Sequence, residues 1–258
     1  MNKFNYKKFQ GVTALSASIT DFKYKKHSHR EYALGVTLNG VQKYNLDGTS
    51  MLSYQNGVML FNPEQTHDGM AGGHSALDYA MLYIDPTIIL EVVNKKEMIK
   101  FQKPIVYNRE LASSIINLHN SITSQKDDVL CCELIINLIG KVVQIDPINK
   151  YKAENVRIKK AKEIMHSNLS KTLKLEEICI ELGISNYQFI RLFNAQTGIS
   201  PYQYYLNCKV ERAKKVIEDK RDVYIAVTEC GFVDLTHLNK HFKRIYGTTA
   251  FEYNSQLN

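Results

Sequence analysis

Three histidines in the N-terminal half have the residue type and spacing to hold a metal ion or a small polar molecule. His27 and His29 are separated by one residue, and on a β-strand such residues project from the same face. His67 follows Gly57 and Pro63 in the string GVMLFNPEQTH. If that string forms a second strand, the three imidazoles could meet, either as metal ligands or as polar groups in an apolar cavity.

This spacing resembles the double motif of cupin proteins, in which His-x-His is followed later by Gly, Pro and a third His. A metal-binding cupin keeps three or four residues between the second His and its Glu, whereas Glu31 comes almost directly after the second His here. Its motif also has Gly after the Pro, where Gln65 stands nearby. We therefore expect no metal and no cofactor, and we predict a small-molecule effector pocket in a β-barrel. The effector-binding candidates are His27, His29, Tyr32, Asn62, His67 and Tyr83. A pure scaffold, in which the histidines only bond to loops, is the alternative.

The C-terminal part contains two similar blocks, LEEICIELGISNYQFIRLFNAQTG and VYIAVTECGFVDLTHLNKHFKRIYG. Each has a helical pattern, a turn with glycine (Gly183 and Gly231) and a second amphipathic helix before a closing glycine (Gly198 and Gly247). The overlay gives an internal repeat of about 49 residues. Each block has the pattern of a helix-turn-helix unit, whose second helix reads the major groove of DNA.

The buried stripe of each second helix leaves a set of residues facing outward. Ser185 and Asp234 are placed to cap these helices. The predicted DNA-binding residues are Asn186, Tyr187, Ile190, Arg191, Asn194, Leu235, Thr236, Asn239, Lys240 and Lys243. Pro201 begins a long helix that would separate the two units, so that they enter successive major grooves about 34 Å apart.

A surplus of basic residues lies mainly in this C-terminal part. The 258-residue chain has a net charge of +7. Residues 1–150 hold 16 Lys and Arg against 14 Asp and Glu, and residues 151–258 hold 17 against 12. Helix-glycine-helix segments are also common in plain helical bundles, but two of them at a fixed spacing in a basic domain favour binding to double-stranded DNA.

The run from Leu175 to Tyr253 resembles the DNA-binding domain of the AraC/XylS family of transcription regulators. The resemblance rests on SNYQFIRLFNAQTG and GISP in the first block, and on Gly231-Phe232, His237-Leu238, HFKR, Tyr246-Gly247 and Glu252-Tyr253 in the second. The strings EYALG and YAMLY in the N-terminal part are similar to the sensor domain usual in that family. The resemblance implies a sequence-specific regulator, activator or repressor, that responds to a small-molecule effector, with RNA polymerase as a further candidate partner.

The resemblance also implies roles for single residues. The first reading helix of such proteins contacts DNA at positions matching Tyr187, Ile190 and Arg191, and arginine can donate two hydrogen bonds to guanine. Asn186 or Asn239 suits adenine. Nearby basic side chains would position the phosphates and make affinity fall with salt. These are Lys209, Lys214, Lys215, Lys243 and Arg244.

The segments before residue 105 predict short β-strands in a small barrel or sandwich. They mix β-branched and aromatic residues, with turn signals at Asn39-Gly40, Asp47-Gly48 and Asn56-Gly57. One short helix is expected near Pro86 to Lys96. Residues 109–145 then show helical periodicity in two helices, the second of which is apolar enough to pack on the barrel and to form a homodimer.

We therefore predict an α+β chain with two domains. Residues 1–148 form a cupin-like β-barrel that binds the effector and dimerises through residues 109–145. Residues 153–258 form an all-α domain with two helix-turn-helix units, after a linker that starts at Asp146 and runs through Asn155.

Two rival functions stay open, a metal-dependent cupin enzyme with an appended helical domain and an adaptor that binds protein through its apolar helix. No catalytic nucleophile, phosphate loop or acid pair stands out, so we expect no enzyme. Five cysteines without zinc spacing predict reduced thiols. We expect the protein in the cytoplasm and away from the membrane, because no apolar run is long enough for a span.

Overall fold

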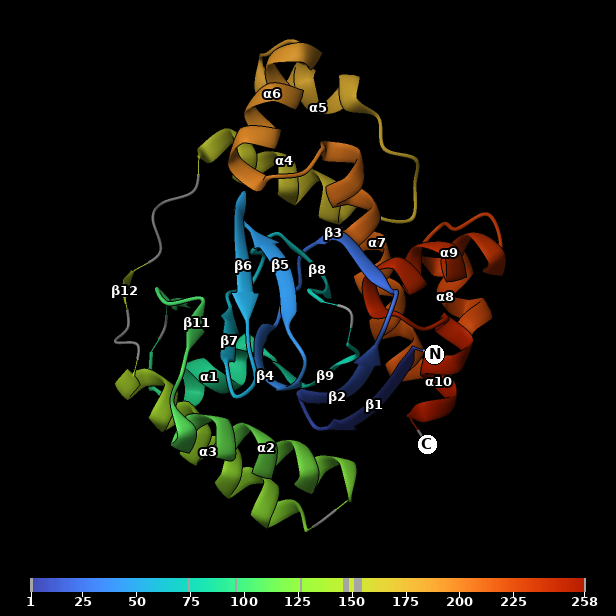
Figure 1. The fold of residues 1–258 in the computed structure, drawn as a ribbon. Helices are drawn as coiled ribbons and strands as arrows, with labels where there is room; N and C mark the ends of the chain where they lie inside the picture. Colours follow the sequence, from blue (N-terminus) through green and yellow to red (C-terminus); the bar gives the residue numbers. More distant parts are fainter. Residues whose placement is uncertain are drawn as a thin grey trace.

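The computed structural model describes residues 2–73, 75–95, 97–125, 127–145, 149–150 and 155–257. Its N-terminal part is built from antiparallel β-sheets with helices on one side, and its C-terminal part is helical (Figure 1). The prediction of an α+β chain with a β-rich first part and an all-α second part is confirmed.

The N-terminal part is a sandwich of two sheets. Its strands are β1 (Lys3–Phe9), β2 (Val12–Ile19), β3 (Lys23–His27), β4 (Tyr32–Asn39), β5 (Gln42–Leu46), β6 (Thr49–Ser53), β7 (Val58–Phe61), β8 (His67–Ala71), β9 (Leu77–Ile84), β10 (Ile99–Lys100), β11 (Ile105–Val106) and β12 (Asn149–Lys150). The larger sheet has the order β1-β2-β9-β4-β7-β11 and the smaller one β3-β8-β5-β6. No strand pairing among the described residues joins these two sheets, so the expected barrel takes the form of an open sandwich.

The predicted turns lie where successive strands reverse direction. β4 and β5 are joined at Asn39-Gly40, β5 and β6 at Asp47-Gly48, and β6 and β7 at Asn56-Gly57. Gly48 has a φ of 85° and Asn56 a φ of 67°, a region that glycine enters freely and asparagine tolerates. The backbone conformation thus explains why these residue types marked the turns.

Helices cover the outer face of the larger sheet. They are α1 (Pro86–Val92), α2 (Arg109–Thr123) and α3 (Asp128–Ile145). Asn108 caps α2 by accepting a hydrogen bond from the Leu111 amide at 2.9 Å, as its residue type favours. Leu34 of β4 and Leu138 of α3 belong to one core with these helices. The other face of the sheet lines the inside of the sandwich.

The C-terminal part consists of α4 (Val156–Ser167), α5 (Leu175–Leu182), α6 (Asn186–Thr197), α7 (Pro201–Lys220), α8 (Val223–Glu229), α9 (Leu235–Tyr246) and α10 (Ala250–Gln256). The pairs α5–α6 and α8–α9 are the two predicted helix-turn-helix units, and α7 connects them. Ser185 caps α6 with a capping box, and Asp234 caps α9. Pro201 occupies the first turn of α7. All three expectations are confirmed.

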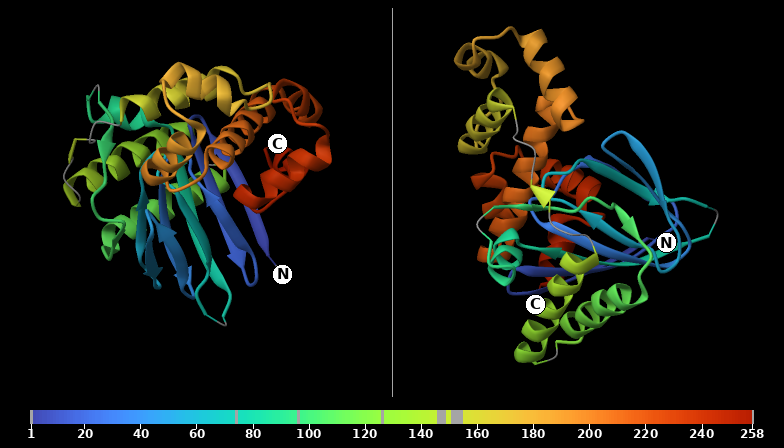
Figure 2. Two further views of the ribbon diagram at one scale, coloured as in Figure 1. Left: turned by 90° about the horizontal axis from the view of Figure 1, so that it is seen from above. Right: turned by 90° about the vertical axis from the view of Figure 1, so that its left-hand side faces the viewer.

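The two helix-turn-helix units belong to different cores. Phe189 and Phe193 of the first unit pack in a core made only of C-terminal helices. Phe242 and Tyr246 of the second unit pack in the core that fills the inside of the sandwich, together with Tyr6 of β1. Helices α9 and α10 accordingly lie against the edge of the sandwich, α9 at β3 and α10 at β1 (Figures 1 and 2).

The predicted linker lies mostly outside the described residues. Asn149 and Lys150 are described as strand β12, which pairs with Ile99 and Lys100 of β10. All five cysteines are free thiols. None of the helices in the described part of the chain combines the length and apolar character that a membrane span requires.

Candidate DNA interface and histidine cluster

Helix α6 presents the first predicted DNA-binding surface to solvent. Its first residues are held by the cap, because the Ser185 hydroxyl accepts from the Gln188 amide at 3.3 Å and the Gln188 side chain accepts from the Ser185 amide at 3.1 Å. Tyr187 is 88% exposed. Asn186, Arg191 and Asn194 are also exposed, and Ile190 is half-buried. The five predicted residues therefore share one accessible face of the helix.

Helix α9 presents a smaller accessible set. Thr236, Lys240 and Lys243 are exposed. Leu235 is half-buried and packs against the core shared with the sandwich. The Asn239 side chain accepts a hydrogen bond from the Ala250 amide at 2.9 Å. The Asn239 oxygen therefore holds the start of α10, and recognition of adenine by this residue stays a prediction.

Two of the lysines expected at DNA phosphates are buried. Lys209 donates to the Gly231 carbonyl at 2.8 Å, and burial lowers its pKa. Lys214 is 6% exposed and forms an ion pair of 2.8 Å with Glu31 of the N-terminal part. These two predictions are corrected, because a side chain held in these contacts does not reach DNA. Lys215, Lys243 and Arg244 are exposed.

Helix α7 carries a set of charged contacts to the N-terminal part. Besides the pair of Lys214 with Glu31, the amide of Arg30 donates to Glu211 at 3.1 Å, and Lys8 pairs with Glu218 at 2.7 Å. The pair of Lys214 with Glu31 is largely buried, whereas Arg30 and Lys8 are exposed. Burial raises the pKa of Glu211, and the neighbouring Glu31 raises it further.

Sequence reasoning missed these interface residues, although Lys214 carried a signal. It follows Val210 by four residues and precedes Ile217 by three, which places it on the apolar face of the helix. A lysine at such a position requires an anionic partner, and Glu31 supplies it.

The second unit is also fixed by aromatic contacts. The Tyr6 hydroxyl donates to the Tyr246 carbonyl at 2.8 Å, and the rings of Tyr6 and Tyr253 meet edge to face with centroids 5.1 Å apart. The position where a side chain would begin at Gly247 is filled by the Phe4 ring. The C-terminal end of α9 is therefore packed directly on β1.

The first unit and the adjoining helix α4 make fewer contacts with the N-terminal part. The Thr66 hydroxyl donates to the Thr197 carbonyl at 2.6 Å, and Lys162 of α4 pairs with Glu64 at 2.5 Å. Glu64 is 41% exposed. Both contacts come from the loop between β7 and β8, and α6 remains accessible.

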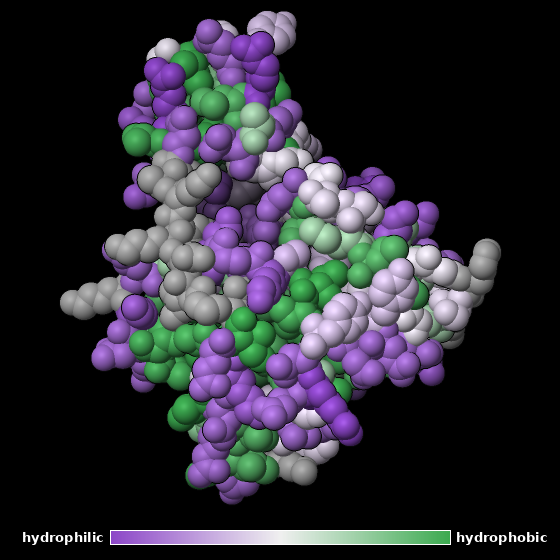
Figure 3. Space-filling view, turned by 60° about the vertical axis from the view of Figure 1, so that its left-hand side comes forward, coloured by the Kyte–Doolittle hydropathy of each residue, from purple (hydrophilic) through white to green (hydrophobic). Residues whose placement is uncertain are grey.

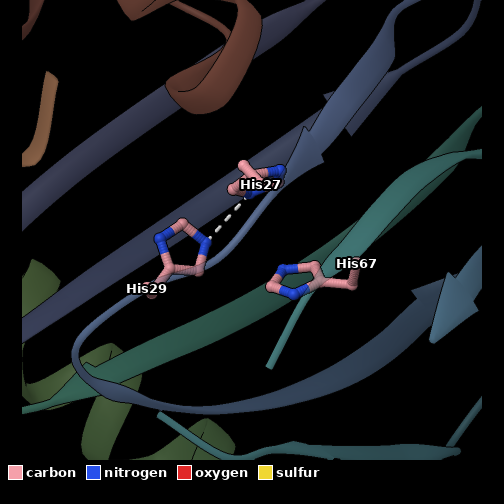
Figure 4. Close-up of side chains that lie close together, drawn as sticks. All are labelled: His27, His29 and His67. Atoms are coloured by element: carbon pink, nitrogen blue, oxygen red, sulfur yellow. Dashed lines mark hydrogen bonds between the residues drawn. The ribbon is translucent and has the colours of Figure 1, made fainter. Parts of the chain in front are cut away.

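The three predicted histidines do meet, and Figure 4 shows their rings turned toward one another. His27 ends β3 and His67 begins β8, and the two are direct partners in the strand pairing. His29 lies in the loop after β3, with its Nε2 atom 3.0 Å from Nε2 of His27. One ring nitrogen from each residue can be chosen so that all three lie within 4.8 Å of one another.

The imidazoles are buried and uncharged. They are 3%, 4% and 9% exposed for His27, His29 and His67, respectively. Burial lowers the pKa of His27 to about 3, with a further contribution from His67. Burial also lowers the pKa values of His29 and His67. At neutral pH each ring therefore offers a nitrogen lone pair.

Tyr83 of β9 joins this cluster, with its ring 5.0 Å from that of His29. Two other predicted pocket residues lie elsewhere. The Tyr32 hydroxyl donates to the Ile99 carbonyl at 2.7 Å, and the Asn62 side chain bonds both backbone groups of Phe101. Both therefore hold the segment around β10 on the outer face of the sheet, and the structure does not bring them to the histidines.

Family models match both parts of the chain. A model described as the AraC-like ligand binding domain matches residues 9–139, and one described as a helix-turn-helix domain matches residues 178–256. The first covers β2 to β11 with α1, α2 and most of α3. The second covers the second helix-turn-helix unit and all of the first except the first three residues of α5.

Curated relatives of this chain are named as transcriptional regulators. The chain is 24% identical to the HTH-type transcriptional regulator YbfI of Bacillus subtilis over 224 residues, which cover 84% of this chain and 82% of that protein. It is 31% identical over 85 residues to the HTH-type transcriptional regulator GbdR of Pseudomonas aeruginosa, covering 33% of this chain and 23% of that protein.

Solved structures share the fold. The crystal structure of ToxT from Vibrio cholerae O395 aligns with a TM-score of 0.61 at 12% identity, covering 97% of this chain and 99% of that one. A second ToxT structure, bound to an unsaturated fatty acid, aligns with a TM-score of 0.62 at 12% identity and covers 100% of this chain and 96% of that one. At this identity the similarity concerns the fold alone.

Proposed function

This chain belongs to the AraC family of transcription regulators, and on that premise we propose that one of its domains binds an effector and the other binds DNA. Residues 1–148 form the effector-binding domain, and residues 153–258 form the DNA-binding domain. The ranges of the two family models support this division. The observation that carries the function is the pair of capped helix-turn-helix units in the basic half of the chain.

DNA is read through the exposed residues of α6 and α9. The contact residues on α6 are Asn186, Tyr187, Ile190, Arg191 and Asn194. Arg191 is exposed, and its guanidinium has the donor geometry for the O6 and N7 atoms of guanine. The accessibility of this whole face supports direct base contact from the first unit.

The contact residues on α9 are Thr236, Lys240 and Lys243, with Leu235 at the edge of the same face. Asn239 joins them only if its bond to the Ala250 amide opens. Lys215 and Arg244 are exposed beside the reading helices, and they position the phosphates. Affinity for DNA should therefore fall as the salt concentration rises.

The protein acts as a homodimer through residues 109–145. Support comes from the face of α3 that points away from the sheet, where Val129 is 66% exposed and Ile136 55% exposed. A Cβ added at Gly140 would meet no atom within 4 Å, so a partner helix could approach closely there. Apolar side chains also show at the surface in the lower part of the molecule, where α2 and α3 lie (Figure 3). A two-fold axis would let this face pair with itself.

The effector acts on the arrangement of the two domains. His27, His29, His67 and Tyr83 form its polar site, and the contact of His29 with Tyr246 at 6.1 Å between ring centroids links that site to the end of α9. An effector can change DNA affinity only through its differential affinity for the two arrangements, typically about 1 to 3 kcal/mol.

The chain works without catalysis, in the cytoplasm, where a bound promoter would bring it beside RNA polymerase. The regulatory names of its relatives support this assignment.

Selection of genomic DNA fragments by the purified protein, at two salt concentrations, tests the proposed function. We expect an enriched motif with two half-elements about one helical turn apart, because α7 holds the two units at a fixed spacing. Binding that depends on salt but enriches no motif would contradict sequence-specific reading.

A further inference from the structure

The histidine cluster has the arrangement of a metal site. We propose that His27, His29 and His67 bind a divalent transition-metal ion such as Zn²⁺, with three imidazole nitrogens as ligands and a fourth position open. The sequence argued against a metal because Glu31 follows His29 too closely for the cupin pattern and because Gln65 stands near the place of its Gly. Neither departure removes an imidazole, and three imidazoles form a metal site without a carboxylate.

Backbone carbonyls orient two of the three rings. Nδ1 of His27 lies 2.6 Å from the Lys25 carbonyl oxygen, and Nδ1 of His67 lies 2.8 Å from the Gln65 carbonyl oxygen. A carbonyl only accepts, so each Nδ1 carries the proton and each Nε2 keeps its lone pair. Metal-binding histidines are held in this way, with the second nitrogen donating to a carbonyl or carboxylate.

The spacing of the nitrogens is close to that of a tetrahedral site. With zinc-nitrogen bonds of about 2.0 to 2.1 Å, two ligand nitrogens lie about 3.3 Å apart. The Nε2 atoms of His27 and His29 are already 3.0 Å apart. All three ligand atoms lie within 4.8 Å of one another, so a ring shift of at most about 1.5 Å completes the site.

The contact between His27 and His29 shows which proton must move. Since His27 donates through Nδ1, its Nε2 accepts, and His29 donates from Nε2. When a metal binds there, the proton of His29 moves to its Nδ1 and the ring stays neutral. The ion therefore replaces the hydrogen bond between His27 and His29.

The surroundings leave space for an ion more readily than for an organic molecule. The Phe61 ring stacks on His67 at 4.5 Å between centroids, and Tyr83 packs on His29 at 5.0 Å. Each imidazole is less than a tenth exposed. An organic ligand would have to displace these rings, whereas an ion fits between nitrogens that already face one another.

The donor set selects the class of metal. Neutral imidazole nitrogens suit Zn²⁺, Co²⁺, Ni²⁺ and Cu²⁺, whereas Mg²⁺ and Ca²⁺ require oxygen ligands. A second group of potential ligands, formed by His29, Glu31 and Glu211, lies at the domain interface. Its carboxylates are already engaged, Glu31 by Lys214 and Glu211 by the Arg30 amide, so the three-histidine group is the metal site.

The regulatory consequence rests on the function proposed above. The ring of His29 lies between the other two histidines and Tyr246 of α9. An ion that fixes this ring would favour one packing of α9 over another, and the metal would then be the effector or part of its site.

Titration of the purified full-length protein with Zn²⁺ by calorimetry, without DNA, tests the site directly. We expect one ion per chain, lost or weakened at least about 100-fold in His67→Gln and in His27→Gln, since even outer-shell changes cost 10- to 100-fold. His119→Gln is the matched control, because His119 is also buried but bonds to Ser16 outside the cluster. It should bind as the wild type does.

Cobalt absorption and the folding of the variants complete the test. Tetrahedral Co²⁺ gives visible absorption bands, and His67→Cys should retain the ion and add a sulfur-to-cobalt band. If His67→Gln fails to fold, the cysteine variant still tests the position. Absence of stoichiometric binding to wild-type protein, or equal affinity in wild type and a folded His67→Gln variant, would overturn the proposal. DNA binding by the metal-free protein is measured separately, so failure of the metal site and failure of the regulator function are distinguished.

Discussion

The two helix-turn-helix units have the same local design but different surroundings. In both, a side chain caps the reading helix and a glycine in the left-handed conformation ends it, Gly198 in one and Gly247 in the other. The first unit has its own core. The second shares its core with the inside of the sandwich, through Tyr246 and Tyr253. The same motif thus has a core of its own in the first unit and a core shared with the sandwich in the second.

This difference indicates where a signal can enter. The first unit meets the sensor through Thr66, and the adjoining helix α4 meets it through Glu64, both in the loop before β8. The second unit meets it through buried aromatic rings, and the adjoining helix α7 through the ion pair of Lys214 with Glu31. Packed interfaces have discrete alternative arrangements, so a ligand in the sandwich should act mainly on α9. The first unit should then supply DNA affinity that depends less on the effector.

The largest expected effect compares the two cores. Phe193→Ala and Phe242→Ala should each lower the free energy of unfolding by about 3 to 5 kcal/mol, because both remove a fully buried ring. Hydrogen-exchange measurements distinguish the two variants. Phe193→Ala should increase exchange in α4 to α6 and at the start of α7, where its ring contacts Tyr204, whereas Phe242→Ala should increase it in α8 to α10, β1 and β3. Unchanged protection of both strands in Phe242→Ala would show that the second unit does not share its core with the sensor.

An intermediate effect compares a buried with an exposed ion pair. Glu31→Gln leaves Lys214 buried without its nearest carboxylate and should lower the free energy of unfolding by about 3 kcal/mol. Glu181→Gln breaks the pair with Lys160 in the first unit, whose side chains are about half exposed, and should cost less than about 1 kcal/mol. Urea denaturation measures both. Equal losses would remove the distinction between the buried and the exposed ion pair.

A smaller effect tests base reading by the first unit. Arg191→Ala should weaken binding to the selected motif by about 1 to 3 kcal/mol and affect random DNA less, because a guanine contact is lost. Lys43→Ala removes a basic side chain from an exposed position on β5, outside both reading helices and the proposed dimer helices, and should leave both affinities unchanged. Fluorescence anisotropy gives the dissociation constants for the selected motif and for random DNA. Equal weakening on motif and random DNA would assign Arg191 to the phosphates.

Local features of the fold could be predicted from the sequence because they depend on neighbouring residues. The caps at Ser185 and Asp234 and the turn at Asp47-Gly48 are examples, since each follows from a side chain or a φ angle within a few residues. The meeting of His27 with His67 also followed, because the two residues are partners on paired strands. His29 was expected on the same strand as His27, but it reaches the other two from the loop after β3.

Other features depended on partners far away in the chain. Tyr32 was expected in the pocket, but both faces of β4 are covered, one by the second sheet and one by helices, so apolar alternation carried no signal. Lys214 was expected at DNA because the residues around it in the sequence do not reveal its pairing with Glu31. This partner lies in the connection between β3 and β4, far earlier in the chain. Whether a lysine faces solvent or another domain is decided by tertiary packing.

Hydroxyl-radical footprinting of the selected DNA motif with the full-length protein tests the central claim most directly. Two helix-turn-helix units on one rigid helix predict two protected patches about 10 base pairs apart on one face of the duplex, with Arg191→Ala weakening one patch and Lys240→Ala the other. Two patches that respond in this way would support reading by both units. A single patch, insensitive to Lys240→Ala, would contradict it and leave the second unit as part of the sensor alone.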